Sequence, residues 1–316
     1  GSQEQGFQQV ADLLERQGSR LEELLADVQA KVVETHGGVQ RIEQQMIAFQ
    51  QQVSELNARL GLREDRQVRS SDTRTIRNED ERRLVTELLA QYRAMPEGQR
   101  RQRPGLLSAV AQLENAAGDH AQAVEDFRAV AALAADDKLR QAEAHFNAYR
   151  AALKRAGVSK RKEDWDAALT ELIKAFNRDR SYMPFDRKYQ PQRILGAGGF
   201  GVTFLCKRRG PGDLVAVKSL TSENLDRDME KVLDEGRLLG SVDHPAIIRM
   251  IDCDYADPDA KSGPFLVMEY FDGQTLEELV NPTSLVPVDQ AAALFRLVAE
   301  GMEAAHAKGV WHRDIK

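Results

Sequence analysis

The spacing of apolar residues changes near Met183-Pro184, and this change constrains the fold of the 316-residue chain more than any other feature. Before it, apolar residues recur at steps of three and four, the period of amphipathic helices. After it, short alternating runs separated by glycines indicate β-strands. The sequence therefore predicts a multidomain chain that is α-helical at first and continues as an α+β domain over 183–316.

A stripe of apolar residues at three- and four-residue steps runs from Phe7 to Leu60. Its phase slips at Gly37 and Gly38, and glycine weakens a helix interior by about 1 kcal/mol relative to alanine. Residues 1–62 are therefore predicted to form a coiled coil or a helical hairpin, through which the protein forms homo-oligomers. A bundle that acts on membranes or senses a partner is the alternative. We interpret Gly1-Ser2 as a tag remnant.

The next segment, 63–104, is rich in Arg, Asp and Glu and has few apolar residues before Leu84. This composition predicts a charged linker with one helix, which starts near Leu84 and stops before Met95-Pro96. Partner binding by the basic residues of this linker is the less favoured alternative.

A weak internal repeat lies within 105–182. Gly118-Asp119-His120-Ala121-Gln122-Ala123, followed by Phe127, matches Glu163-Asp164-Trp165-Asp166-Ala167-Ala168, followed by Leu172. This pattern resembles the second helix of tetratricopeptide repeats, with 107–117 and 142–153 as the first helices. The copies lie further apart than the family's period of about 34 residues, which predicts an inserted loop around 157–162. The resemblance implies binding of a protein partner; a helical spacer is the alternative.

Charge and cysteine content exclude several classes of function. Lys and Arg number 44 against 50 Asp and Glu, and the net charge of -6 argues against nucleic acid as a partner. Cys206 and Cys253 are too few for a disulfide framework, and no Cys/His spacing resembles a zinc site. No apolar run of about 18 residues or more appears, so no membrane span is predicted. We expect a cytoplasmic protein.

The hexapeptide Gly196-Ala197-Gly198-Gly199-Phe200-Gly201 has the G-x-G-x-x-G spacing of a phosphate-binding loop. A dinucleotide-binding turn needs a helix after the glycines. Here β-type residues follow, then a Gly210-Pro211-Gly212-Asp213 turn and the run Leu214-Val215-Ala216-Val217-Lys218. The pattern therefore predicts an antiparallel hairpin that folds over a ligand.

These motifs, with three more in the same order, resemble the protein kinase family. Glu235 precedes His244-Pro245 as the glutamate of the family's αC helix does, Leu266-Val267-Met268-Glu269-Tyr270-Phe271 resembles the strand and hinge, and His312-Arg313-Asp314-Ile315-Lys316 resembles the start of the catalytic loop. The resemblance covers the chain from about Tyr189. It implies a kinase N-lobe, made of an antiparallel sheet and the αC helix, and the start of the helical C-lobe.

The resemblance also implies a site for ATP. Gly196, Ala197, Gly198, Gly199, Phe200 and Gly201 would cover its phosphates, and Lys218, held by Glu235, would neutralise two of them. Leu195 and Ala216 would enclose the adenine ring, Met268 would guard the back of the pocket, and backbone groups of Glu269 and Phe271 would pair with the adenine edge. Thr203 stands where the family usually has valine, so nucleotide binding is weakened at most modestly.

For catalysis, the resemblance implies that Asp314 orients and deprotonates the acceptor hydroxyl and that Lys316 steadies the transferring phosphate. A lysine at this place favours a serine or threonine acceptor. The family's Mg2+ ligands would lie beyond Lys316, so no metal ligand is assigned. We therefore expect an inactive N-terminal piece of a serine/threonine protein kinase that uses ATP and Mg2+ to phosphorylate proteins. The alternative is a pseudokinase scaffold, in which the nucleotide lobe is a switch and the helices are the effector.

Overall fold

The computed structural model describes residues 40–61, 76, 78–100, 102–220, 229–276 and 286–311. The chain divides into two compact units, Gly1–Leu56 and Asn57–Lys316. The described part of the first unit is helical from residue 40 onward, and its buried side chains include Met46, Phe49 and Val53. Their spacing is that of the predicted stripe, whereas the glycine pair, the hairpin alternative and the tag remnant lie outside the described residues.

Helix α2 (Glu79–Ala94) lies in the second unit. The predicted stop before Met95-Pro96 is confirmed. The helix starts earlier than predicted because Asn78 caps it, its side-chain oxygen accepting a 2.8 Å hydrogen bond from the backbone N–H of Glu81. The acidic residues after the cap also suit the positive end of the helix dipole.

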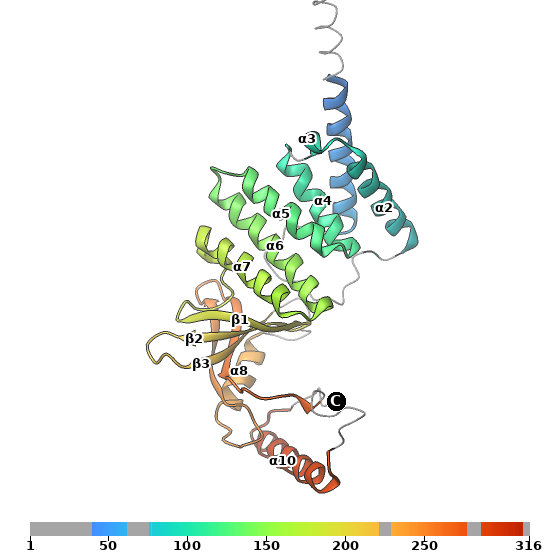
Figure 1. Cartoon of the computed structure of the whole chain (residues 1–316). Coiled ribbons are helices and arrows are strands. Elements are labelled where there is room, and N and C mark those ends of the chain that lie inside the picture. The colour runs from blue at the N-terminus through green and yellow to red at the C-terminus, as the bar shows by residue number, and fades with distance from the viewer. Residues whose placement is uncertain are drawn as a thin grey trace, which may run out of the picture. The chain divides into compact units, whose positions relative to one another are not determined.

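Helix pairs occupy the middle of the chain and are drawn in green in Figure 1. The short helix α3 (Glu97–Arg100) precedes them, and the pairs are α4 (Pro104–Ala117) with α5 (His120–Leu133) and α6 (Lys138–Ser159) with α7 (Lys162–Arg178). Ala123 and Ala168 are fully buried, and no more than 2% of the surface of Phe127 and Leu172 is exposed. The helices of the internal repeat are thus confirmed, while their assignment as tetratricopeptide repeats stays a prediction.

The prediction of an inserted loop around 157–162 is wrong. Helix α6 continues to Ser159 and has 22 residues against 14 in α4, and α7 begins at Lys162. The additional turns are stable because Leu153 and Ala156 continue the buried face of α6. The longer offset between the repeat copies therefore comes from a longer helix.

Glu114 of α4 is a buried acid, with 1% of its surface exposed. Its Oε1 accepts a 3.4 Å hydrogen bond from Arg93 of α2, whereas its Oε2 has no hydrogen-bond partner among the described residues. Burial, reinforced by the charge of Asp126, raises the pKa of Glu114 to about 7. Carrying this acid in its ionised form is therefore costly for the folded state.

We expect Glu114→Gln to alter how stability depends on pH. The folded pKa lies above the unfolded one, so the folded state binds the proton more tightly, and the free energy of unfolding falls as pH rises from about 4.5 to about 7. The amide keeps the shape and cannot ionise. Urea denaturation should show that the free energy of unfolding of the variant, relative to that of the wild type, rises by about 1 kcal/mol or more between pH 5 and pH 8. If this difference between the two proteins stays constant over the range, Glu114 does not ionise in its buried position.

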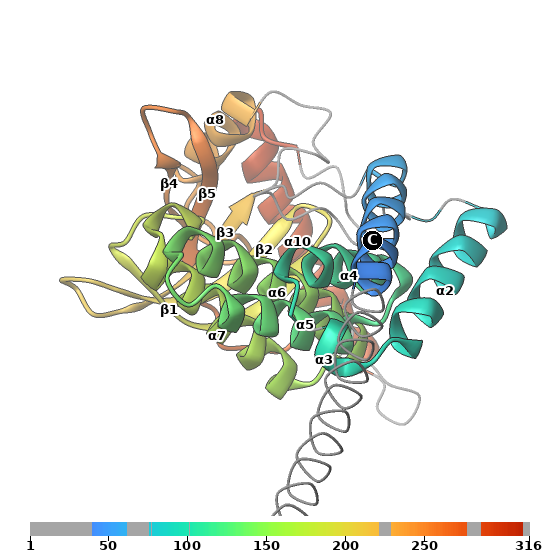
Figure 2. The same ribbon diagram turned by 90° about the horizontal axis from the view of Figure 1, so that it is seen from above.

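After the 3-10 turn η1 (Arg180–Tyr182), a five-stranded antiparallel sheet follows, with strand order β1-β2-β3-β5-β4. Its strands are β1 (Tyr189–Gly198), β2 (Gly201–Arg208), β3 (Leu214–Leu220), β4 (Met250–Asp257) and β5 (Ser262–Glu269), accompanied by α8 (Met229–Leu239) and α10 (Val288–Ala307). Figure 2 shows this part from above. None of the described helices is both long and apolar enough to span a membrane.

The register of the strands gives the sheet two different faces. One, the Lys218 face, carries the cross-strand partners Thr203, Lys218 and Leu266, and also Leu205, Ala216 and Met268. The other, the Phe204 face, carries Phe204, Val217 and Val267, which are fully buried. Residues in register share a face because side chains alternate along each strand. Four of the predicted ligand residues therefore lie on one side, namely Thr203, Ala216, Lys218 and Met268, and the apolar core lies on the other.

Candidate functional site

The glycine-rich segment forms a tight hairpin between β1 and β2. Gly198 pairs directly with Gly201, so Gly199 and Phe200 form its tip. Gly201 has φ +136°, and a Cβ there would overlap the carbonyl oxygen of Ser219. A Cβ at Gly196 or Gly198 would meet no atom within 4 Å. The fold therefore requires glycine at 201, whereas at 196 and 198 glycine keeps the backbone open to the space beside the hairpin.

Lys218 lies beside this hairpin on β3, opposite Thr203 of β2. Its side chain is half-buried, and burial lowers its pKa because the charged form loses solvation. Its ammonium lies 5.9 Å from the centre of the Phe200 ring, near the outer limit of a cation–π contact. Within the described part of the chain no carboxylate forms an ion pair with this ammonium, which leaves it able to receive an anionic ligand.

Glu235 lies on α8, which packs against the Lys218 face. At its neighbour Gly236, a Cβ would come within 3.2 Å of Leu266, the cross-strand partner of Lys218. Gly236 is buried and Glu235 half-buried, so the side of α8 that faces the sheet is centred on the glycine. The structure therefore places Glu235 on a helix, as predicted, but Glu235 does not form the predicted ion pair with Lys218.

The residues predicted to surround adenine fall into two groups. Ala216, 8% exposed, and the half-buried Met268 are direct cross-strand partners on the Lys218 face. Leu195 is 38% exposed at an irregular position of β1, and Phe271 is 70% exposed after the end of β5. Glu269 already donates its backbone N–H to the carbonyl of Arg249 at 3.0 Å. The apolar floor is thus formed by strands, while the hinge contacts remain predictions.

The remaining predicted residues are placed as follows. Ala197 pairs with Val202 in the hairpin, and Gly199 lies at its tip. Asp314 and Lys316 lie outside the described residues, so their catalytic roles stay predictions.

Sequence reasoning missed two residues that support the site from behind. Phe185 and Tyr189, 1% and 2% exposed, pack on the Phe204 face of the sheet, which holds the hairpin strands. The signal that could have identified them is local: Tyr182, Phe185 and Tyr189 are closely spaced in a chain with only 6% aromatic residues.

Residues 189–316 match the family model described as protein kinase domain. The chain is 35% identical over 133 residues to serine/threonine-protein kinase pkn2 of Myxococcus xanthus, covering 42% of this chain and 15% of that protein. It is 40% identical over 132 residues to calcium-dependent protein kinase 9 of Oryza sativa subsp. japonica, covering 41% and 22%. For the probable serine/threonine-protein kinase PknB of Corynebacterium glutamicum the identity is 31% over 132 residues, covering 41% and 20%.

The chain thus spans less than a quarter of the length of each of these relatives. Among solved structures, the kinase domain of Mycobacterium tuberculosis PknI is 23% identical with a TM-score of 0.36, covering 42% of this chain and 53% of that one. The sequence matches support a protein kinase domain over 189–316 with serine/threonine kinases among its relatives, and the family match begins after the end of α7.

Proposed function

We propose that residues 183–316 form the nucleotide-binding half of a serine/threonine protein kinase, which binds ATP with Mg2+ and, in the whole protein, phosphorylates serine or threonine side chains of other proteins. The observation that carries this proposal is the half-buried ammonium of Lys218, which has no ion pair within the described part and lies beside a glycine hairpin. A triphosphate supplies the negative charge that this environment lacks.

The residues present fit a nucleotide. The open backbone at Gly196 and Gly198 suits N–H groups that bind phosphate oxygens, and Ala216 with Met268 offers an apolar surface for adenine. Bound Mg2+ neutralises charge on the phosphates. Among the described residues no group of three or more potential metal-ligating side chains occurs, so we assign none to the ion. Lys218 binds and orients the phosphates, and Asp314 and Lys316 act on the acceptor hydroxyl and the transferring phosphate.

The helical regions complete the proposal. The apolar stripe of residues 1–62 assembles copies of the chain, and the helix pairs α4–α7 bind a protein partner in the manner of tetratricopeptide repeats. Small buried residues at Ala123 and Ala168, where neighbouring helices approach closely, support this assignment.

We expect a non-hydrolysable ATP analogue with Mg2+ to bind the chain, and Gly198→Ala to weaken this binding about tenfold by displacing a phosphate-to-backbone hydrogen bond. The new methyl group meets no protein atom within 4 Å, so the melting temperature without ligand should stay unchanged. Calorimetric titration gives the affinity. Gly157→Ala is the matched control, because its Cβ also meets open space, on α6. Absence of binding to the wild type would refute the nucleotide site, and equal affinity of both variants would refute the role of Gly198.

A pseudokinase scaffold is the second candidate, favoured by one observation: the Lys218 ammonium lies 5.9 Å from the centre of the Phe200 ring and forms no ion pair with Glu235. The two candidates differ in phosphoryl transfer. A chain with a complete helical lobe, incubated with Mg2+-ATP and serine- and threonine-containing proteins, should transfer phosphate if the first proposal holds. Nucleotide binding without any transfer would favour the scaffold.

A further inference from the structure

An aromatic segment before β1 belongs to the core of the sheet. The ring of Phe185 lies edge-on to Phe204 of β2, with centroids 5.1 Å apart, and to Phe265 of β5 at 6.4 Å. Phe185 is 1% exposed, although it precedes the residues that match the kinase domain. Aromatic pairs in this geometry add to the free energy of burial. The Phe204 face is therefore completed by a residue from outside the matched region.

The same segment is attached to the helices at its other end. The ring of Tyr182 packs against Phe146 of α6, with centroids 4.8 Å apart. Strand β1 contacts both α6 and α7. One continuous hydrophobic core contains Ala111 of α4 and buried residues of α5, α6, α7, the aromatic segment and strands β1, β2, β3 and β5. No break in the core separates the helix pairs from the sheet.

Lys188 and Tyr189, at the start of β1, both contact the opposite edge strand of the sheet. The Tyr189 hydroxyl donates a 2.8 Å hydrogen bond to Oδ2 of Asp252, and the Lys188 ammonium lies 2.9 Å from the same oxygen. Tyr189 begins β1 and Asp252 lies on β4, and these two strands are the opposite edges of the sheet. The contact therefore ties together the two edges, one of which leads into the glycine hairpin.

We propose that α6 and α7 are an integral part of the nucleotide lobe, and that the segment Tyr182–Tyr189, the aromatic bridge, couples them to the glycine hairpin. Phe185 and Tyr189 are positioning residues: they hold β1 and β2 from behind, while Lys218 and the open glycine backbone lie on the other face. A partner that binds the helices changes the hairpin through this bridge. The effect of the bridge on nucleotide binding rests on the proposed function, whereas the coupling between the helices and the glycine hairpin does not.

Hydrogen exchange of the full chain tests the coupling, with Phe146→Ala as the variant, because Phe146 lies on α6 and its ring packs against Tyr182 of the bridge. We expect backbone amides of 201–208 to exchange about tenfold faster, since loss of packing lowers the free energy of local opening. Phe146→Leu should restore most of the protection. Affinity for the Mg2+-ATP analogue should fall at least about threefold in Phe146→Ala.

Leu113→Ala is the matched control, since Leu113 is fully buried in α4 but lies outside the continuous core. It should leave exchange in 201–208 within about twofold of the wild type. Faster exchange in α6 and α7 alone, or an equal effect of both variants on β2, would overturn the proposal. If Phe146→Ala does not fold, Phe146→Leu and Tyr182→Leu are judged by the same criteria. If the wild type does not bind nucleotide, the proposed function is refuted. The hydrogen-exchange result then still decides whether the aromatic bridge couples the helices to the hairpin.

Discussion

Lys218→Met is expected to weaken binding of the Mg2+-ATP analogue by about 100-fold while leaving the folded chain at least as stable as the wild type. Two charge-assisted hydrogen bonds to phosphate contribute about 1.5 kcal/mol or more each, which corresponds to this factor. Methionine retains the length and apolar stem of lysine. Because Lys218 is half-buried and has no ion pair in the described structure, its removal relieves a desolvation cost.

Lys207→Met is the control for this prediction, since Lys207 is an exposed lysine on β2 of the same sheet. It removes the same charge from the chain but should change the affinity by less than about twofold. Calorimetric titration gives the two affinities, and thermal unfolding without ligand gives the two stabilities. Equal affinities in the two variants would show that Lys218 is not the phosphate-binding cation, whereas a large loss of stability would show that its charge is compensated in the folded state.

The parts of the fold that could be predicted are those in which one local pattern decides the structure. The glycine hairpin and β3 follow from alternation and turn residues, whereas the helix with Glu235 follows from the resemblance to the protein kinase family. Strand β4 was not recognised, because its acidic residues, among them Asp252 and Asp254, are unusual in strands. Pairing with β5 and the Tyr189 contact stabilise it, and neither can be seen in the local sequence.

The sequence predicts which residues form the candidate site, but it does not predict how they are arranged. Sequence order placed Lys218 and Glu235 on adjacent elements, yet the rotation of α8 is set by how Gly236 packs against Leu266. A single helix rotation cannot be derived from a motif. In the same way, Phe185 has no periodic neighbours, so its role in the core depends on tertiary packing alone.

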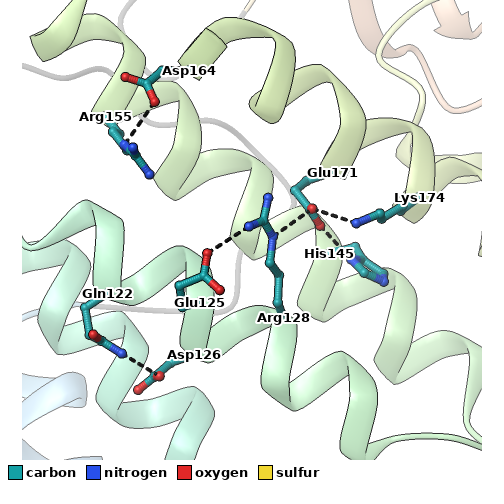
Figure 3. A network of polar contacts seen from close by, with 9 residues as sticks. All are labelled: Gln122, Glu125, Asp126, Arg128, His145, Arg155, Asp164, Glu171 and Lys174. Atoms are coloured by element: carbon teal, nitrogen blue, oxygen red, sulfur yellow. Dashed lines mark hydrogen bonds and ion pairs between the residues drawn. The ribbon is translucent and has the colours of Figure 1, made fainter.

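A buried ionic network joins three helices of the repeat region (Figure 3). Glu171 of α7 is fully buried, and its Oε1 accepts hydrogen bonds from Arg128 of α5 and from Lys174, each at 2.9 Å. Its Oε2 lies 2.7 Å from Nδ1 of His145 on α6. Burial alone would raise the pKa of Glu171, but the hydrogen bonds from His145 and Lys174 and the charge of Arg128 outweigh it and lower the pKa to about 2. This one carboxylate therefore connects α5, α6 and α7.

We expect Glu171→Ala to lower the free energy of unfolding by about 3 kcal/mol or more at pH 7, because it leaves the buried His145 and parts of two cations without their acceptor. The folded pKa lies below the unfolded one, so the contribution of Glu171 is present above about pH 5 and is lost as pH falls towards 2. Urea denaturation at several pH values gives the difference between variant and wild type, which should shrink in this range. Glu163→Ala, at an exposed acid in the first turn of α7, should cost less than about 1 kcal/mol. A loss of unfolding free energy in Glu171→Ala that is as small as that in Glu163→Ala, or that is independent of pH, would contradict this expectation. Either result would show that the three donors find other acceptors and that the network does not hold the helices together.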